Sequence, residues 1–143
     1  MPAMKNTTVG ETSRMEDAPG VGPQEDITVG QFCGDWISTN TSTRGIARIS
    51  IRAEDRGLSV RAFGAGEHEL NDWGTVLAEV FAEGASATRV RAFRAFYDFG
   101  FLETWLQAKT EKGVLVIASF NRFKDQSGRS NYFSREFFYR ASI

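Results

Sequence analysis

The segment "NYFSREFFYR", residues 131–140, places ionisable and hydroxyl side chains among aromatic ones. Side chains alternate between the two faces of an extended strand, so one face carries five of them: Tyr132, Ser134, Glu136, Phe138 and Arg140. A carboxylate on an inner face needs an arginine, a tyrosine or a ligand, because burying it without a partner is costly. Glu136 and Tyr132 are therefore candidate acid–base residues. The alternative for Glu136 is a place on an outer wall beside a basic residue.

A second glutamate raises the same question in "FLETWLQAK", residues 101–109. Glu103 shares a face with Phe101, Trp105 and Gln107, opposite a face of Leu102, Thr104, Leu106 and Ala108. Both faces hold large apolar residues, so alternation does not decide which one points inward. If Glu103 is inside, it is a third catalytic candidate, and Arg91 and Arg94 are the nearest basic partners in sequence order. If it is outside, we expect it to pair with an arginine or lysine on the outer wall.

Other catalytic patterns are absent from the sequence. It contains no glycine-rich phosphate loop, no G-x-S-x-G and no H-E-x-x-H. A single cysteine and a single histidine exclude Cys/His zinc spacing, and we expect no metal and no cofactor. His68 could act as a general base beside its acidic neighbours, but a solvated loop residue is the favoured interpretation. Cys33 has no basic neighbour in the sequence and is interpreted as a small hydrophobic residue.

Short alternating segments separated by turn residues must position these side chains. "IARISIRAE" alternates with Ala47, Ile49, Ile51 and Ala53 on one face, and Asp55-Arg56-Gly57 and Glu111-Lys112-Gly113 are predicted to be tight turns. The pattern predicts strands at about 33–41, 46–54, 58–65, 73–83, 86–97, 101–110, 114–123 and 131–140. Eight strands with hairpin connections favour an all-β, antiparallel up-and-down barrel, because closure removes exposed edges. A barrel of this size either holds one small ligand or is filled by side chains.

Composition divides the chain near residue 31. Residues 1–30 contain all 3 prolines and no aromatic residue, with five acidic and two basic groups. This composition predicts a flexible N-terminal tail before a barrel domain at 31–143. The whole chain has a net charge of -1, which gives no reason to expect nucleic acid or a membrane as a partner. We find no apolar leader segment and expect a cytoplasmic protein.

The motif "GDW" at residues 34–36 and the terminal "FFYR" together resemble the lipocalin and calycin barrels. The segments "RGIARISI", "NDWG" and "SGRSNYFSREFFYR" resemble small intracellular bacterial members of this group, which have no export signal. We identify no leader, disulfide or C-terminal helix like those of secreted lipocalins, so we do not expect an extracellular carrier. The resemblance implies that Trp36 plugs one end of the barrel and that Arg140 lies across its ring. Gly34 would then allow close backbone approach at this corner.

Three hypotheses for the function follow from these observations. The first is a barrel that binds a small, largely apolar or aromatic molecule, with ligand contacts expected from Trp36, Arg94, Trp105, Asn121, Ser134 and Phe138. The second, which the family resemblance suggests, is a cofactor-independent cyclase or isomerase acting on a secondary-metabolite intermediate in the same interior. Its catalytic candidates are Glu136, Glu103 and Tyr132. The third is a homodimer that associates through exposed aromatic side chains.

Overall fold

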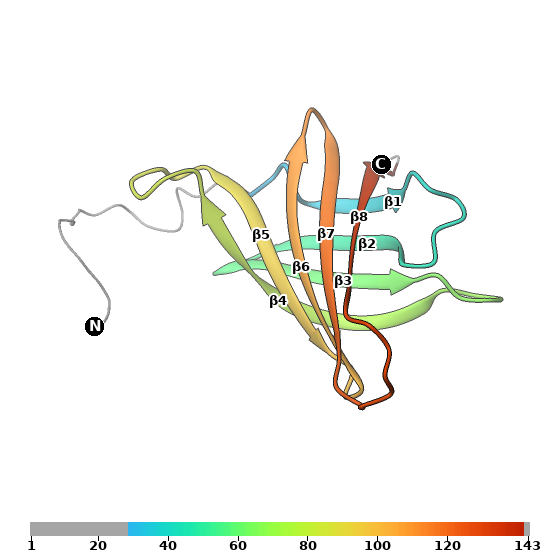
Figure 1. The fold of residues 1–143 in the computed structure, drawn as a ribbon. Coiled ribbons are helices and arrows are strands. Elements are labelled where there is room, and N and C mark those ends of the chain that lie inside the picture. Colours follow the sequence, from blue (N-terminus) through green and yellow to red (C-terminus); the bar gives the residue numbers. More distant parts are fainter. Residues whose placement is uncertain (1–28, 142–143) are drawn as a thin grey trace, which may run out of the picture.

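The structure, a computed structural model, describes residues 29–141 of the 143-residue chain. The protein is all-β, as predicted, and its strands follow one another along the chain (Figure 1). They are β1 (Gly34–Ser38), β2 (Ile46–Glu54), β3 (Gly57–Gly64), β4 (Asn71–Ala82), β5 (Val90–Asp98), β6 (Leu102–Glu111), β7 (Val114–Phe123) and β8 (Tyr132–Arg140). Over this part of the chain, no helix has the length and apolar character that crossing a membrane requires.

The predicted tail lies outside the described residues except for its last two positions, Val29 and Gly30. These two open a turn before β1, in which the Phe32 N–H donates to the Val29 carbonyl at 2.9 Å. Val29 is half-buried and packs against the core. Val29 and Gly30, which the composition assigns to the tail, are therefore part of the described fold.

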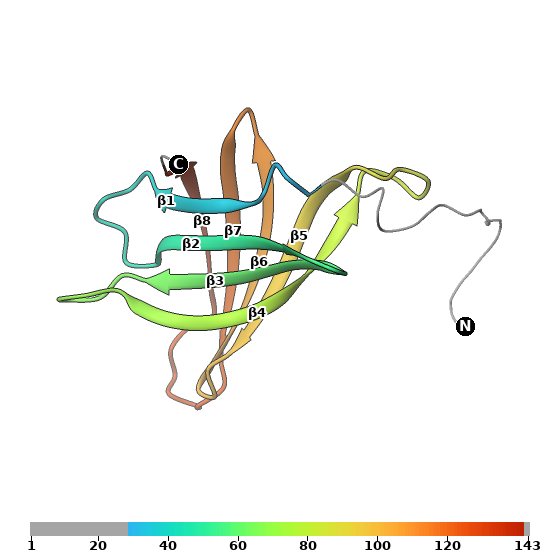
Figure 2. The ribbon, with the colours of Figure 1, turned by 180° about the vertical axis from the view of Figure 1, so that it is seen from behind.

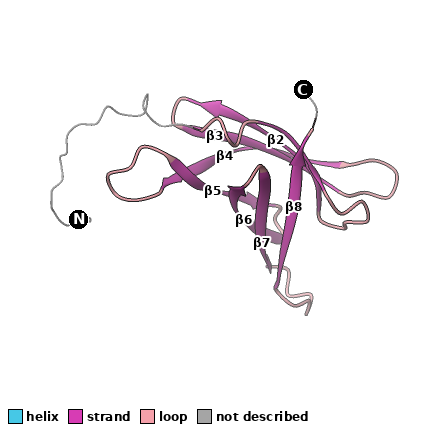
Figure 3. Ribbon diagram, turned by 90° about the horizontal axis from the view of Figure 1, so that it is seen from above, coloured by secondary structure: helices cyan, strands magenta, loops and turns pink. Residues whose placement is uncertain are grey.

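The strands form one closed antiparallel barrel in which each strand pairs with the next and β8 returns to β1. The predicted up-and-down topology is thus confirmed. The barrel is flattened into two layers: β1–β4 cross in front of β5–β8 in Figure 2, and the same layers are visible from above in Figure 3. Two short seams join them. β1 and β8 pair at three positions, and β4 and β5 pair at four.

Strand ends differ from the prediction where loops make their own hydrogen bonds. The fifth strand begins at Val90 rather than near residue 86, because residues 84–87 form a turn in which the Ala87 N–H donates to the Gly84 carbonyl at 3.1 Å. Both predicted tight turns are present, with Glu54 paired to Gly57 and Glu111 to Val114.

The strict alternation expected in β2 is wrong at its first residues. A bulge between Ile46 and Arg48 inserts one extra residue, which shifts the inward face by one position. Ile46, Ile49 and Ile51 are therefore buried, while Ala47 is only half-buried and Ala53 is exposed. Period-two patterning does not indicate an inserted residue, and Ala47, being small and apolar, fits the expected inward pattern as well as a regular position would.

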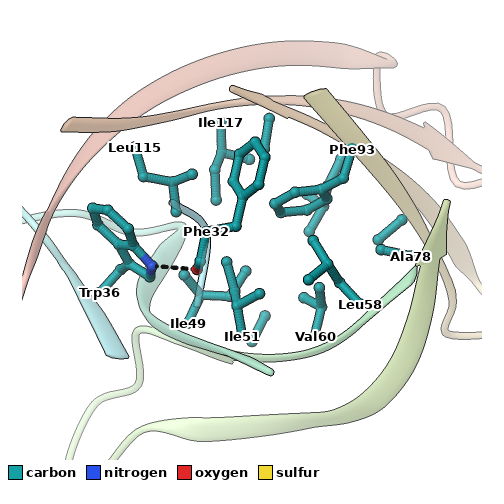
Figure 4. Close-up of a cluster of buried hydrophobic side chains, with 14 of the residues drawn as sticks. Phe32, Trp36, Ile49, Ile51, Leu58, Val60, Ala78, Phe93, Leu115 and Ile117 are labelled. Atoms are coloured by element: carbon teal, nitrogen blue, oxygen red, sulfur yellow. Dashed lines mark hydrogen bonds between the residues drawn. The ribbon is translucent and has the colours of Figure 1, made fainter. Parts of the chain in front are cut away.

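Apolar side chains fill one end of the barrel, where the β2–β3 and β6–β7 hairpins lie (Figure 4). Phe32, from the turn before β1, is fully buried and meets the ring of Phe93 edge-on, with 5.2 Å between centroids. Residues from both layers close around it, including Ile49, Ile51, Val60, Leu115 and Ile117. This end is a packed core.

Trp36 closes this packed end as the sequence predicts. It is fully buried, and its indole N–H donates to the Phe32 carbonyl at 2.9 Å. The Arg140 guanidinium carbon lies 4.4 Å from the Trp36 ring centroid, and the guanidinium also donates to the carbonyls of Gln31, at 3.0 Å, and Cys33. The expected cation–π contact is therefore confirmed.

Gly34 serves this contact in a way that differs from the expectation. It was expected to admit close backbone approach, but a Cβ at this position would lie 2.8 Å from Arg140 Nη1. Its φ of +132° is also one that other residues rarely adopt. The glycine thus makes room for the arginine side chain.

Candidate functional site

A pocket of about 300 Å³ lies at the opposite end of the barrel, where even-numbered strands begin and odd-numbered strands end. In Figure 1 this end lies toward the lower right, at the loops after β1, β3, β5 and β7. Its lining comes from both layers: Arg44, Gly45, Ile46, Trp73, Phe99, Leu102, Thr104, Ser119, Asn121, Tyr132, Ser134 and Glu136. The interior is therefore divided into a core at one end and a pocket at the other.

One wall of the pocket is polar and is built by the inward faces of β6, β7 and β8. The Thr104 hydroxyl donates to Asn121 Oδ1 at 2.7 Å, and both side chains are buried. The Asn121 amide in turn donates to the Tyr132 carbonyl at 3.4 Å. One position further along, Ser119 and Ser134 face each other across the β7–β8 pair. Neither serine hydroxyl has a hydrogen-bond partner among residues 29–141, so both can contact a ligand.

Glu136 supplies the carboxylate of this wall. It is half-buried and accepts a hydrogen bond from the Thr43 hydroxyl, in the loop between β1 and β2. The Gly45 N–H donates to the same hydroxyl at 3.0 Å, which turns the Thr43 proton toward the carboxylate. Within the described residues, no lysine or arginine nitrogen forms an ion pair with Glu136. Among residues 29–141 the carboxylate is thus oriented by a hydrogen bond and is not neutralised by a cation.

Aromatic rings form the facing wall. Trp73 meets Tyr97 and Phe99 edge-on at centroid distances of 5.3 and 5.1 Å, and Tyr97 stacks on Phe99. The Trp73 indole lies against Gly64, where a Cβ would approach its Nε1 to 2.6 Å. Edge-to-face pairs of this kind hold rings in a defined orientation. The aromatic wall is therefore a rigid apolar surface opposite the serines and Glu136.

Tyr97, on β5, links the aromatic wall to β3 and β4 through its hydroxyl group. Its buried hydroxyl donates to the Gly74 carbonyl at 2.7 Å and accepts the Ala62 N–H at 3.1 Å. Ala62 lies at a bulge between β3 and β4, where regular pairing is interrupted. Burial raises the pKa of Tyr97, so the hydroxyl remains a donor at neutral pH. Its role here is structural.

The structure brings four of the residues proposed from the sequence into this pocket: Glu136, Tyr132, Asn121 and Ser134. Two others, Trp36 and Phe138, belong to the buried core at the packed end. Three residues lie on the outside of the barrel: Arg94, Glu103 and Trp105. On β6, the face that points inward is the one with Thr104, Leu106 and Ala108, because these residues are buried while Trp105 is 40 % exposed.

Glu103 therefore lies on the outer wall and pairs with basic residues there, which is the second of the two expectations for it. Its carboxylate is 2.7 Å from Arg122 Nη2 and 3.5 Å from Lys124 Nζ. The hydrogen bond from Arg122 lowers the pKa of Glu103, and the two cations add to this effect. Arg94 likewise pairs with Glu79 at 2.8 Å on the outer wall and lies over the Trp105 ring. None of these three side chains reaches the pocket.

Several pocket residues are not found by the sequence analysis. Thr43, which orients Glu136 but does not itself line the pocket, lies in a loop without periodicity, 93 positions from Glu136 in the chain. Trp73 and Phe99 stand at strand ends, where alternation no longer indicates direction. Ser119 could have been identified from alternation, because it shares an inward face with Leu115, Ile117 and Asn121.

The remaining candidates stay outside the pocket. His68 is exposed in the β3–β4 loop, and Cys33 is a half-buried free thiol beside the Val29 carbonyl. From Val29 to Ala141, no three His, Cys, Asp or Glu side chains gather as a metal site would require.

Comparison with known proteins adds no further assignment. The closed antiparallel barrel of eight strands is compatible with a calycin-like fold. No protein-family model, curated protein or solved structure matches the chain.

Proposed function

We propose that this barrel binds a small organic molecule in the pocket at its open end. The observation that carries the proposal is the pairing of two unlike walls: an oriented carboxylate with two serine hydroxyls, opposite a rigid aromatic surface. Ligand sites typically combine an apolar surface with a few placed polar groups, in volumes of about 300–1,000 Å³. At about 300 Å³ this pocket suits a ligand of one or two rings.

The chemistry of the walls defines the ligand further. A flat apolar body fits against Trp73 and Phe99, and a hydrogen-bond donor fits the Glu136 oxygen that accepts no hydrogen bond from the described residues. A protonated amine suits this position best, because hydrogen bonds between charged groups are about twice as strong as neutral ones. Arg44 also lines the pocket and would repel a protonated amine. Because Arg44 is exposed to solvent, this repulsion is weak.

A matched series of probes tests this function. Benzylamine, benzyl alcohol and benzoate share one ring and differ in charge, and their binding to the full chain can be followed by amide chemical shifts in NMR. We expect benzylamine to bind most tightly, with shifts concentrated at pocket residues. Glu136→Gln should weaken benzylamine by about 10-fold or more, from the loss of one charge-assisted hydrogen bond.

Glu103→Gln is the control, since it removes an equivalent charge from the outer wall. It should leave the benzylamine affinity unchanged. Shifts that avoid the pocket, or equal weakening by both substitutions, would refute the assignment of this site.

The second candidate function is a cofactor-independent cyclase or isomerase. It is favoured by the position of Glu136 and Tyr132, which both line the pocket from β8. A carboxylate that the Thr43 hydroxyl orients could take a proton from a substrate held against the aromatic wall. Glu136→Gln would then lower turnover by about 10²–10⁴-fold while ligand binding is largely retained. A ring-closure or isomerisation assay on Glu136→Gln and Glu103→Gln separates catalysis from binding alone.

We further infer a relation to the calycin barrels, as the motifs suggest. The support is the meander topology together with the fully buried Trp36 and the guanidinium of Arg140 over its ring.

A further inference from the structure

A row of aromatic side chains crosses the outer face of the β5–β8 layer. Phe96, Trp105, Phe120 and Phe133 are direct cross-strand neighbours on successive strands, and we call them the aromatic row. Phe96 and Trp105 lie 4.4 Å apart between ring centroids, and Phe120 and Phe133 lie 5.1 Å apart. Trp105, Phe120 and Phe133 remain 40, 43 and 57 % exposed. Single exposed apolar residues are ordinary, but a contiguous patch on an outer face marks an interaction surface.

Charged rows border the aromatic row on both sides, one strand repeat of about 7 Å away. On one side Asp98, Glu103 and Arg122 are cross-strand neighbours. On the other side Arg94 and Gln107 pair across β5 and β6, and Arg135 occupies the corresponding place on β8. At β5 the flanks thus carry opposite charges: Asp98 on one side and Arg94 on the other.

We propose that the aromatic row is the contact surface for a second copy of this chain. A two-fold dimer requires a surface that complements itself, and aromatic rings on four successive strands can pack against the same row of a second copy. Aromatic residues are also enriched in the buried centres of protein interfaces. Face-to-face association would remove the exposed parts of Trp105, Phe120 and Phe133 from water.

The charges select one orientation of the two copies. With the two-fold axis along the aromatic row, each flank lies over the opposite flank of the other copy, so Arg94 faces Asp98 of the second copy. With the axis across the row, Arg94 would instead face Arg135 of the second copy, which is repulsive. Glu103 would then face Arg122, but these two already form an ion pair within each chain and gain less from the second copy. The first orientation is therefore the one we assign. Arg94 retains Glu79 as its own partner, and its five N–H donors suffice for both carboxylates.

Sedimentation of the full chain over a concentration series tests the contact. We expect a dimer at micromolar concentration, and we expect Trp105→Ser combined with Phe133→Ser to raise its dissociation constant by about 100-fold or more. Leu70→Ser is the matched control, because Leu70 is 44 % exposed in the loop between β3 and β4, in the other layer of the barrel. A chain that remains monomeric at about 100 μM, or a dimer indifferent to the aromatic substitutions, would overturn the proposal.

Charge reversal then tests the orientation. Arg94→Asp and Asp98→Arg should each weaken the dimer, and the double variant should recover most of the loss, because the facing pair is restored with its signs exchanged. Far-UV circular dichroism establishes that each variant is folded. Recovery supports the axis along the row, while two single effects that simply add in the double variant contradict it.

Discussion

The contact between Trp36 and Arg140 should appear as a coupling energy in a double-mutant cycle. We expect Trp36→Leu and Arg140→Met each to lower the free energy of unfolding. Arg140→Met removes the cation–π contact and two hydrogen bonds to carbonyl oxygens, together about 2–3 kcal/mol. Trp36→Leu costs more than the shape change alone, because it leaves the buried Phe32 carbonyl without its donor.

Of the interactions that these substitutions remove, only the cation–π contact joins Trp36 to Arg140, so only this contact contributes to the coupling energy. For exposed pairs this interaction contributes about 0.5–1 kcal/mol, and for desolvated pairs about 2. Here the ring is fully buried and the arginine is exposed, so we expect a coupling of about 1 kcal/mol. Urea unfolding followed by circular dichroism measures each corner of the cycle.

Arg135→Met provides the control cycle with Trp36→Leu. Arg135 is on the same strand and also lies over an aromatic ring, that of Phe137, but on the outer face. This cycle should be additive within about 0.3–0.5 kcal/mol. If the Arg140 cycle is equally additive, the guanidinium does not stabilise the indole and the plug has no energetic basis.

Three further substitutions have defined outcomes. Tyr97→Phe removes the hydroxyl that donates to the Gly74 carbonyl, and it should lower the free energy of unfolding by about 1–3 kcal/mol in urea titrations; an unchanged midpoint would contradict the structural role. The hydrogen bond from Arg61 lowers the pKa of Asp72 to about 2 from 3.8, so this carboxylate stabilises the folded state above pH 3.8 and loses that contribution as pH falls toward 2. Asp72→Asn should flatten this part of the stability–pH curve, and an identical curve would mean that the pair does not form in solution. Gly34→Ala introduces a Cβ at φ +132° and should lower the melting temperature more than Gly84→Ala, which has open space around it; equal effects would argue against the tight corner.

The sequence predicts the fold well because inward and outward positions differ in polarity over most strands. In β3, for example, Leu58, Val60 and Ala62 alternate with more exposed residues, and the observed burial follows this alternation. The prediction loses accuracy where the backbone departs from regular pairing. The bulge near Ala47 and the loop before Val90 depend on hydrogen bonds that composition does not reveal.

The candidate site is predicted in part, for a similar reason. On β8, only one face can carry Arg140 to Trp36, and this places Glu136 and Tyr132 inside. On β6 no such anchor exists, and the large ring of Trp105 suggests burial although it packs outside against Phe96. Thr43 reaches Glu136 through a tertiary contact that no local sequence pattern indicates.

The meander order of the barrel has a consequence for how the chain folds. Every neighbouring strand pair is local in sequence except β1–β8, where Trp36 meets Arg140 across the whole domain. Hairpins can therefore form one after another, whereas closure must bring distant segments together and bear the entropy of a loop of about 100 residues. Contacts made only at closure are absent from an early transition state, so substitutions there accelerate unfolding and leave the folding rate nearly unchanged. The contact between Trp36 and Arg140 thus controls the unfolding rate of the barrel rather than its folding rate.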